Sequence, residues 1–125
     1  MRLYIVGVAI ESQDRFVDVT FTLEFESDAE QTKSILKHAL INQPPFHGVV
    51  EVGNSVQCTV TCATVAKLRE CVEALADVER EVVSKLNEIE RVERIAKACA
   101  GYYVKQVLDS RMWNEDTENE DTENE

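Results

Sequence analysis

Cysteine and histidine are the side chains in this chain that most readily suggest a zinc site. Cys58 and Cys62 fall on one face of a predicted strand, and His38 or His47 could join them as ligands. Residues four apart in a strand lie roughly 13 Å apart, however, and one Zn²⁺ with bonds of about 2.3 Å cannot bridge them. We expect Cys58, Cys62 and Cys71 to be small core residues. The two histidines are expected at the surface or in turns, and no metal or cofactor is expected.

Catalysis has no signature in the sequence either. No G-x-S-x-G, P-loop or G-x-G-x-x-G pattern occurs. The abundant carboxylates alternate with lysine and arginine at helical spacing, which is typical of a solvated helix face. Tyr102, Tyr103 and Trp113 could form an aromatic patch that packs under a helix end or at an interface. The sequence therefore predicts a protein that is not an enzyme.

The stretch 64–109 is the element around which the rest of the chain is organised. Apolar residues recur there every three or four positions and charged residues fill the other positions, which predicts an amphipathic helix. One straight helix of this length would measure roughly 69 Å, whereas a domain of about 100 residues has a radius of gyration near 13 Å. Two outcomes are open. Either the helix breaks around 84–87 and folds back, or its far half presents an apolar stripe to a partner.

The second outcome assigns a partner-binding role to four residues of this stripe. They would lie beyond the reach of the domain's own sheet if the helix stays straight: Val82, Leu86, Ile89 and Val92. An apolar patch of that width left in water usually marks a binding site. We therefore expect these four residues to dock against helices of a larger protein.

The residues before the long helix predict strands and one shorter helix. Residues 3–10 and 16–25 predict two strands in a hairpin, the second with clear alternation of apolar and polar positions. Ser27 and Glu30 fit a capping box that opens a helix, which the two prolines at 44 and 45 end. This helix separates the first hairpin from the remaining strands.

A second hairpin completes the predicted sheet. Gly53-Asn54 is a tight-turn signal between strands at 49–52 and 56–62. The order β-β-α-β-β-α predicts an α+β fold with an antiparallel sheet, helices on one face and a long C-terminal helix. The predicted domain covers 1–113.

Charge is concentrated at the end of the chain. The net charge is −11 over 125 residues, and seven of the acidic residues fall in the last eleven positions. Without those seven, 17 acidic residues face 13 basic ones, a mild acidity that argues against strong autonomous binding to nucleic acid. Residues 114–125, which hold a tandem Asp-Thr-Glu-Asn-Glu repeat, predict a disordered acidic tail. This tail could confer solubility or dock on a basic surface.

The sequence also predicts a compartment. The apolar run 3–10 is too short to span a membrane, lacks a small-residue cleavage site and is followed by Glu11, so no signal peptide is expected. The four cysteines show neither a CxxC pair nor the spacing of a secreted domain. A reducing cytoplasm is the expected location, with no membrane partner.

Residues 16–85 resemble a known family in the order of their elements and in local patterns. A strand at 20–27 runs straight into a helix at 29–40, a short hairpin comes next at 49–56, and a helix is entered through Lys67-Leu68-Arg69. This arrangement is similar to the small, dimer-forming CTAG-like subunits of the KEOPS complex. Leu68, Arg69 and Cys71 match the family's helix pattern, whereas Ala74 stands where the family often has asparagine.

The resemblance implies a non-catalytic assembly and dimerisation subunit. Its partner would be the carbamoyltransferase that makes threonylcarbamoyladenosine in tRNA, with tRNA contacted only indirectly. The resemblance also implies a homodimer, or a heterodimer with a paralogue if this chain is a divergent copy. Two alternatives remain open: a coiled-coil-type adaptor, supported by the long helix, and a ligand-binding regulatory domain of ferredoxin-like shape.

Overall fold

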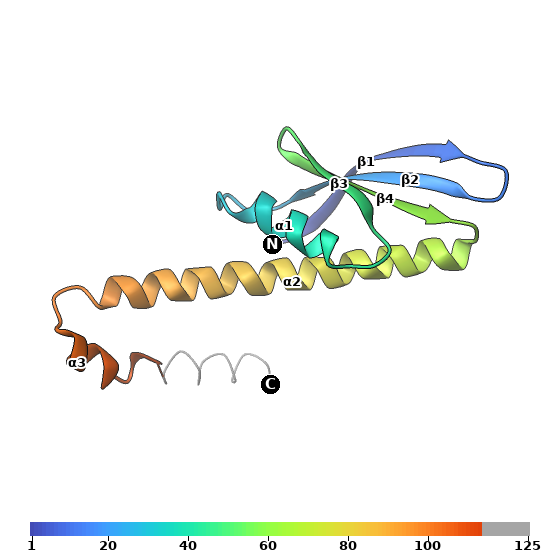
Figure 1. Ribbon diagram of the computed structural model, residues 1–125. Coiled ribbons are helices and arrows are strands. Elements are labelled where there is room, and N and C mark those ends of the chain that lie inside the picture. The colour runs from blue at the N-terminus through green and yellow to red at the C-terminus, as the bar shows by residue number, and fades with distance from the viewer. Residues whose placement is uncertain (114–125) are drawn as a thin grey trace. The chain divides into compact units, whose positions relative to one another are not determined.

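The structure, a computed structural model, describes residues 1–113 (Figure 1). The predicted acidic tail at 114–125 lies outside the described residues. The sequence pattern predicts one domain over 1–113, but the chain divides after Leu86 into two compact units, Met1–Leu86 and Asn87–Glu125. Leu86 is also the last buried residue of the long helix, so the division falls where the core of the first unit ends.

The described chain alternates strands and helices as the sequence predicted, with one short helix added. The elements are β1 (Leu3–Ser12), β2 (Val17–Phe25), α1 (Thr32–Ile41), β3 (His47–Val52), β4 (Ser55–Cys62), α2 (Val65–Ala98) and α3 (Val104–Leu108). The four strands form one antiparallel sheet in the order β1-β2-β4-β3. The α+β prediction is therefore confirmed.

The two central strands, β2 and β4, form the apolar face of the sheet on which the core is built. Alternate residues of β2 pair with alternate residues of β4, and these pairs are buried together: Val19 with Val60, Phe21 with Cys58, and Leu23 with Val56. Directly opposed side chains share one face of an antiparallel sheet, so two alternating strands make one continuous apolar layer. This face is called the inner face below.

The other face of the central strands is a ladder of small polar side chains. Thr20 and Thr59 share a hydrogen bond of 2.9 Å between their hydroxyl oxygens, and the Thr61 hydroxyl donates to Asp18 at 2.7 Å. These polar groups satisfy one another across neighbouring strands.

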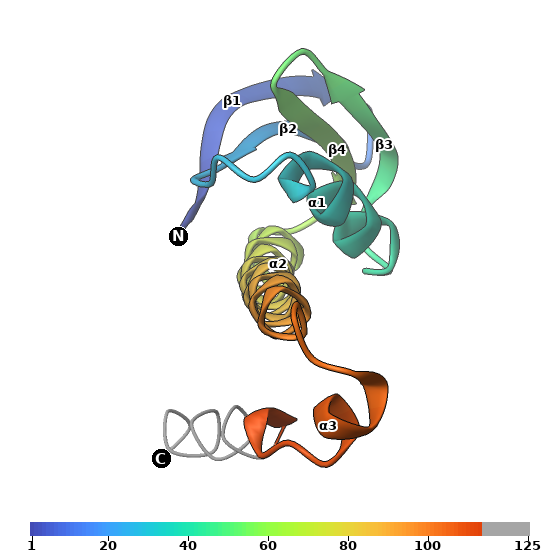
Figure 2. The ribbon, with the colours of Figure 1, turned by 90° about the vertical axis from the view of Figure 1, so that its left-hand side faces the viewer.

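Both α1 and the first part of α2 pack on the inner face (Figure 2). From α1 the core takes Leu36, Ala39 and Leu40, and from α2 it takes Cys71, Ala74, Leu75, Val78, Val82 and Leu86. The helix α1 lies over β3, β4 and β2. Within the described residues of the first unit, both helices lie on the same face of the sheet, as predicted.

The predicted capping box at Ser27 is wrong. The helix α1 begins at Thr32, and no side chain caps its first turn. Ser27 instead accepts hydrogen bonds from the Ala29 N–H, at 3.2 Å, and from the Thr32 hydroxyl, at 3.0 Å. A serine that bonds its own neighbouring backbone competes with helix formation, which delays the helix to Thr32.

The turn between β3 and β4 is confirmed at Gly53-Asn54. Val52 pairs with Ser55, so two residues close the hairpin, and Gly53 has φ +59°. A positive φ at the first of two loop residues is typical of a type II′ turn, where glycine is favoured because it has no Cβ.

The long helix does not break at 84–87, so that outcome is wrong. Thr64 accepts the Lys67 N–H at 3.1 Å and thereby caps the first turn of α2. The helix then runs for 34 residues and ends at Ala98, before Gly101 with φ +89°. Glycine reaches this left-handed conformation at low cost, and α3 starts beyond it.

Candidate functional site

The four residues of the predicted partner-binding stripe differ in how far they are buried. Val82 is 0% exposed and Leu86 is 7% exposed, and both belong to the core of the first unit. The expectation that they lie beyond the sheet is wrong, because α2 packs on the inner face as far as Leu86. These two side chains have no surface to offer a partner in the folded chain.

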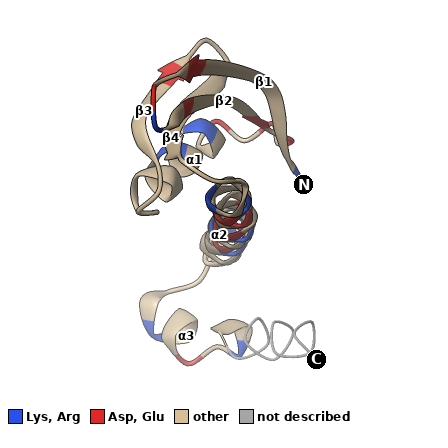
Figure 3. Ribbon diagram, turned by 90° about the vertical axis from the view of Figure 1, so that its right-hand side faces the viewer, with Lys and Arg blue, Asp and Glu red and all other residues tan. Residues whose placement is uncertain are grey.

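Ile89 and Val92 belong to the second unit of the chain. Ile89 is half-buried and Val92 is 58% exposed. Acidic and basic residues both occur along α2 (Figure 3), and Arg91 forms an ion pair with Glu88 at 2.9 Å. Ile89 and Val92 therefore form an apolar surface within a charged helix, which we call the distal stripe.

The rest of the described second unit is also open to solvent. None of the described residues 87–113 is buried. Tyr102 and Tyr103 are exposed, as a surface aromatic patch requires, whereas the Trp113 indole N–H donates to the Val107 carbonyl at 2.9 Å. Its exposed apolar side chains, which include Val92, Val104 and Leu108, are the kind that often mark a binding surface when they gather in a patch.

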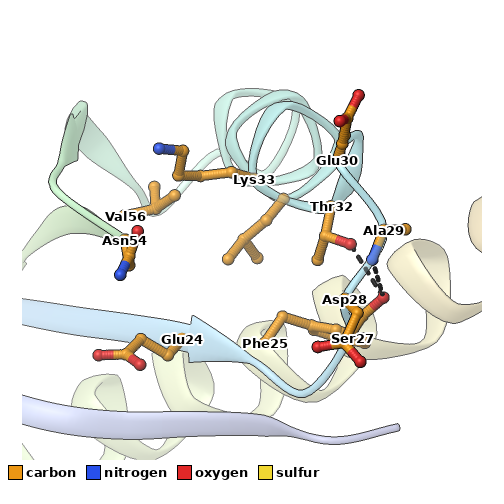
Figure 4. Close-up of a pocket in the computed structure, with 11 residues that line it drawn as sticks. Glu24, Phe25, Ser27, Asp28, Ala29, Glu30, Thr32, Lys33, Asn54 and Val56 are labelled. Atoms are coloured by element: carbon orange, nitrogen blue, oxygen red, sulfur yellow. Dashed lines mark hydrogen bonds between the residues drawn. The ribbon is translucent and has the colours of Figure 1, made fainter.

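An open cavity of about 400 Å³ lies where β2 leads into α1 (Figure 4). Its lining includes the carboxylates of Glu24, Asp28 and Glu30 and the ammonium of Lys33. Lys33 donates to the Gly53 carbonyl at 2.8 Å, and Glu24 accepts the Ser55 hydroxyl at 3.0 Å. These bonds tie α1 and β2 to the β3–β4 hairpin, so they serve the fold rather than a ligand.

The cysteines occupy the places that the sequence predicted. Cys58, Cys62 and Cys71 are buried in the core, with the sulfurs of Cys62 and Cys71 4.0 Å apart. Burial raises the pKa of the Cys58 thiol to about 12, and nearby Cys71 adds to the effect. Burial likewise raises the pKa of Cys71. Thiols held in the neutral form are poor nucleophiles and poor metal ligands.

The histidines are placed apart from these thiols. His47 is exposed on the edge strand β3, where its Nε2 lies 3.2 Å from the Thr61 hydroxyl oxygen, and His38 lies on α1. Within residues 1–113, no group of three or more His, Cys, Asp or Glu side chains is arranged to hold a metal ion.

Sequence reasoning missed a second apolar surface, on β1. This strand stands at one edge of the sheet and has β2 as its neighbour. Five of its large apolar side chains are exposed: Tyr4, Ile5, Val6, Val8 and Ile10. The available signal is the run of apolar residues at 3–10, which predicts a strand but does not say that so many of its side chains stay exposed.

Comparisons with protein-family models, with curated proteins and with solved structures found no match for this chain. Among residues 1–113, no helix has the length and apolar character that crossing a bilayer needs. The distal stripe and β1 both present exposed apolar side chains, Val92 on the first and Val8 and Ile10 on the second.

Proposed function

We propose that this protein is a non-catalytic assembly subunit that works in the cytoplasm. The proposed partner is the carbamoyltransferase of the KEOPS complex, and the proposed role is to support threonylcarbamoyladenosine modification of tRNA. The specific complex comes from the resemblance of residues 16–85 to its small subunits. The general role, binding another protein without catalysis, draws its support from the surfaces of the chain.

The observation that carries the proposal is the exposure of the distal stripe. Ile89 and Val92 continue the apolar face of α2 past Leu86, which is its last buried residue. Apolar side chains that repeat along a helix and find no partner within the chain are typical of a surface that packs against another helix. Burying each of these side chains is worth about 1.5–3 kcal/mol before the costs of association are subtracted.

The acidity of the chain fits an indirect relation to tRNA. Acidic residues outnumber basic ones, 24 to 13, and α2 carries residues of both signs (Figure 3). A strong autonomous RNA-binding surface needs clustered lysine and arginine. The proposed subunit therefore acts through its protein partner and leaves tRNA contact to the rest of the complex.

The test is capture of the carbamoyltransferase by the tagged full-length chain from its native cells. The double variant I89D/V92D should no longer capture the carbamoyltransferase, because two carboxylates would be desolvated at the interface. The matched control is Asn87→Asp, which adds charge at an exposed position on roughly the opposite side of α2, at 100° per residue. Loss of the enzyme with the control variant as well, or retention with both, contradicts a role for the distal stripe.

A coiled-coil-type adaptor is the second candidate, favoured by the uninterrupted 34 residues of α2. It predicts the same sensitivity of partner binding to I89D/V92D. The captured protein would then be unrelated to tRNA modification, and deletion of this chain would leave threonylcarbamoyladenosine in tRNA at its normal level. Mass spectrometry of hydrolysed tRNA separates the two candidates.

A further inference from the structure

The two edge strands of the sheet differ in how well they are protected against pairing with another strand. The edge strand β3 has 6 residues, a register irregularity between His47 and Val50, and α1 packed beside it. The other edge strand, β1, has 10 residues and carries no charged side chain from Leu3 to Ile10. Natural sheets protect their edges with charges, prolines or short strands. Both edge strands carry one register irregularity, but by length and charge β3 is protected and β1 is not.

The inner face of β1 is apolar but exposed. Leu3 and Ile5 are opposite Phe25 and Leu23, so their side chains share the inner face of the sheet. After a bulge at Val6 the alternation changes phase, and the inner positions become Val8 and Ile10. Val8 is 55% exposed and Ile10 is 67% exposed. Within residues 1–113 the outer edge of β1 has no strand neighbour, so this strip suits a strand-shaped, apolar partner.

The change of phase makes β1 complementary to its own copy. Inner residues before the bulge have odd numbers and those after it have even numbers. An antiparallel pair that matches the segment before the bulge with the segment after it therefore brings inner positions opposite one another only when the paired residue numbers have an odd sum. With a sum of 13, Leu3 of one copy is opposite Ile10 of the other, and Ile5 is opposite Val8. Small residues then accommodate large ones, because Tyr4 is opposite Ala9 and Val6 is opposite Gly7.

The same register brings opposite charges together at both ends of the strand. Arg2 and Glu11 flank the uncharged run and are both exposed. When the numbers sum to 13, Arg2 of each copy is opposite Glu11 of the other. Opposite charges in directly opposed positions favour pairing, and like charges disfavour it. Face, size and charge thus all select one register.

We propose that β1 pairs edge to edge with β1 of a second copy, antiparallel and in this register. The bulges of the two copies then face each other at the dyad, and the regular segments pair on either side. At the Leu3 end the N–H already donates to Glu79 Oε2 at 2.8 Å, so the new backbone hydrogen bonds are expected over 4–9. The proposal does not depend on the proposed function, because it concerns the other unit of the chain.

The first test measures the mass of the full-length chain by light scattering across a concentration series. The wild type should be a dimer, and Val8→Glu should raise the dissociation constant by roughly a hundredfold or more, because the carboxylate would be desolvated against an apolar strand. The matched control, Val50→Glu, lies at an exposed position of the protected edge strand β3. Circular dichroism should show both variants folded. A monomeric wild type, or dissociation by Val50→Glu alone, overturns the proposal.

The second test addresses the register through charge reversal. R2E and E11R should each weaken the dimer by roughly threefold to tenfold, since each places like charges opposite one another at both ends. The double variant R2E/E11R restores opposite charges and should return the dissociation constant to near the wild-type value. Additive weakening in the double variant contradicts the register.

The third test is a disulfide that can form only between different copies. Chains carrying Ile5→Cys and chains carrying Val8→Cys, both in a Cys99→Ser background, are mixed and oxidised. Opposed Cβ atoms in such a pair lie about 4.5–5.5 Å apart, close to disulfide geometry. The mixture should give a crosslinked dimer, whereas each chain alone should give little. Equal crosslinking of the separate chains, or none in the mixture, overturns the proposed register.

Discussion

The backbone N–H of Leu3 donates a hydrogen bond of 2.8 Å to the carboxylate of Glu79, joining the start of β1 to the middle of α2. The two residues are 76 positions apart in sequence. This bond fixes the end of an edge strand that has one strand neighbour, and Glu79 is half-buried there. The contact adds to the pairing with β2 in holding the start of β1, and with it the apolar strip that the strand presents.

Removing the carboxylate should loosen β1. We expect Glu79→Ala to lower the free energy of unfolding by about 1–2 kcal/mol, in the range for a hydrogen bond to a charged group that is partly solvated. Glu79→Gln is the control, because its amide oxygen can still accept the Leu3 N–H, and it should lose less. Urea unfolding followed by circular dichroism measures both. Equal stability of Glu79→Ala and the wild type would show that the bond contributes nothing.

Truncation of two apolar residues of α2 should change stability by different amounts, because one is buried and the other is exposed. Leu86→Ala is expected to cost about 2–5 kcal/mol because it opens a cavity in the core of the first unit. Val92→Ala removes an exposed side chain and should change stability by less than about 0.5 kcal/mol. Chemical denaturation of both variants is the measurement. Similar losses for the two variants would mean that Val92 is also packed within the folded chain.

The turn between β3 and β4 should require glycine. Gly53 has φ +59°, a conformation that costs a residue with a Cβ about 1–2 kcal/mol. Gly53→Ala should therefore lower stability by about that amount, although no atom would contact the added methyl group. Thermal melting gives the comparison. An unchanged melting temperature would show that the hairpin closes by another turn geometry.

The buried thiol of Cys58 should make stability fall at alkaline pH. The unfolded thiol loses its proton near its ordinary pKa of about 8.5, whereas burial keeps the folded pKa at about 12. Between these values the unfolded state binds fewer protons, so the free energy of unfolding decreases as pH rises through this window. In Cys58→Ala the decrease should be shallower. Parallel stability curves for the variant and the wild type across this window would exclude this linkage.

Much of the fold follows from local patterns in the sequence. The alternation of Val19, Phe21 and Leu23 identified the buried side of β2, and the glycine at position 53 identified the second hairpin. Both signals are physical requirements of a short segment: one apolar face for a strand, and a positive φ for a turn. They did not depend on distant parts of the chain.

The features that the sequence did not reveal depend on contacts between distant segments. Where α2 leaves the sheet is decided by the extent of the inner face, so the burial of Val82 and Leu86 could not be told from the exposure of Val92. Residues 3–10 of β1 include no polar side chain apart from the Tyr4 hydroxyl, so they showed no alternation from which the bulge at Val6 could be inferred. Ser27 resembled a helix cap by type and spacing, but its hydroxyl bonds Ala29 and Thr32 in a turn.

The most direct measurement of the central claim is quantitative mass spectrometry of the proteins captured by the tagged wild-type chain and by its I89D/V92D variant in native cells. The proposed function predicts a carbamoyltransferase captured in near-stoichiometric amount by the wild type and by Asn87→Asp, and lost with I89D/V92D. Absence of any carbamoyltransferase from the wild-type sample, with the tagged chain folded and recovered in full, would contradict it.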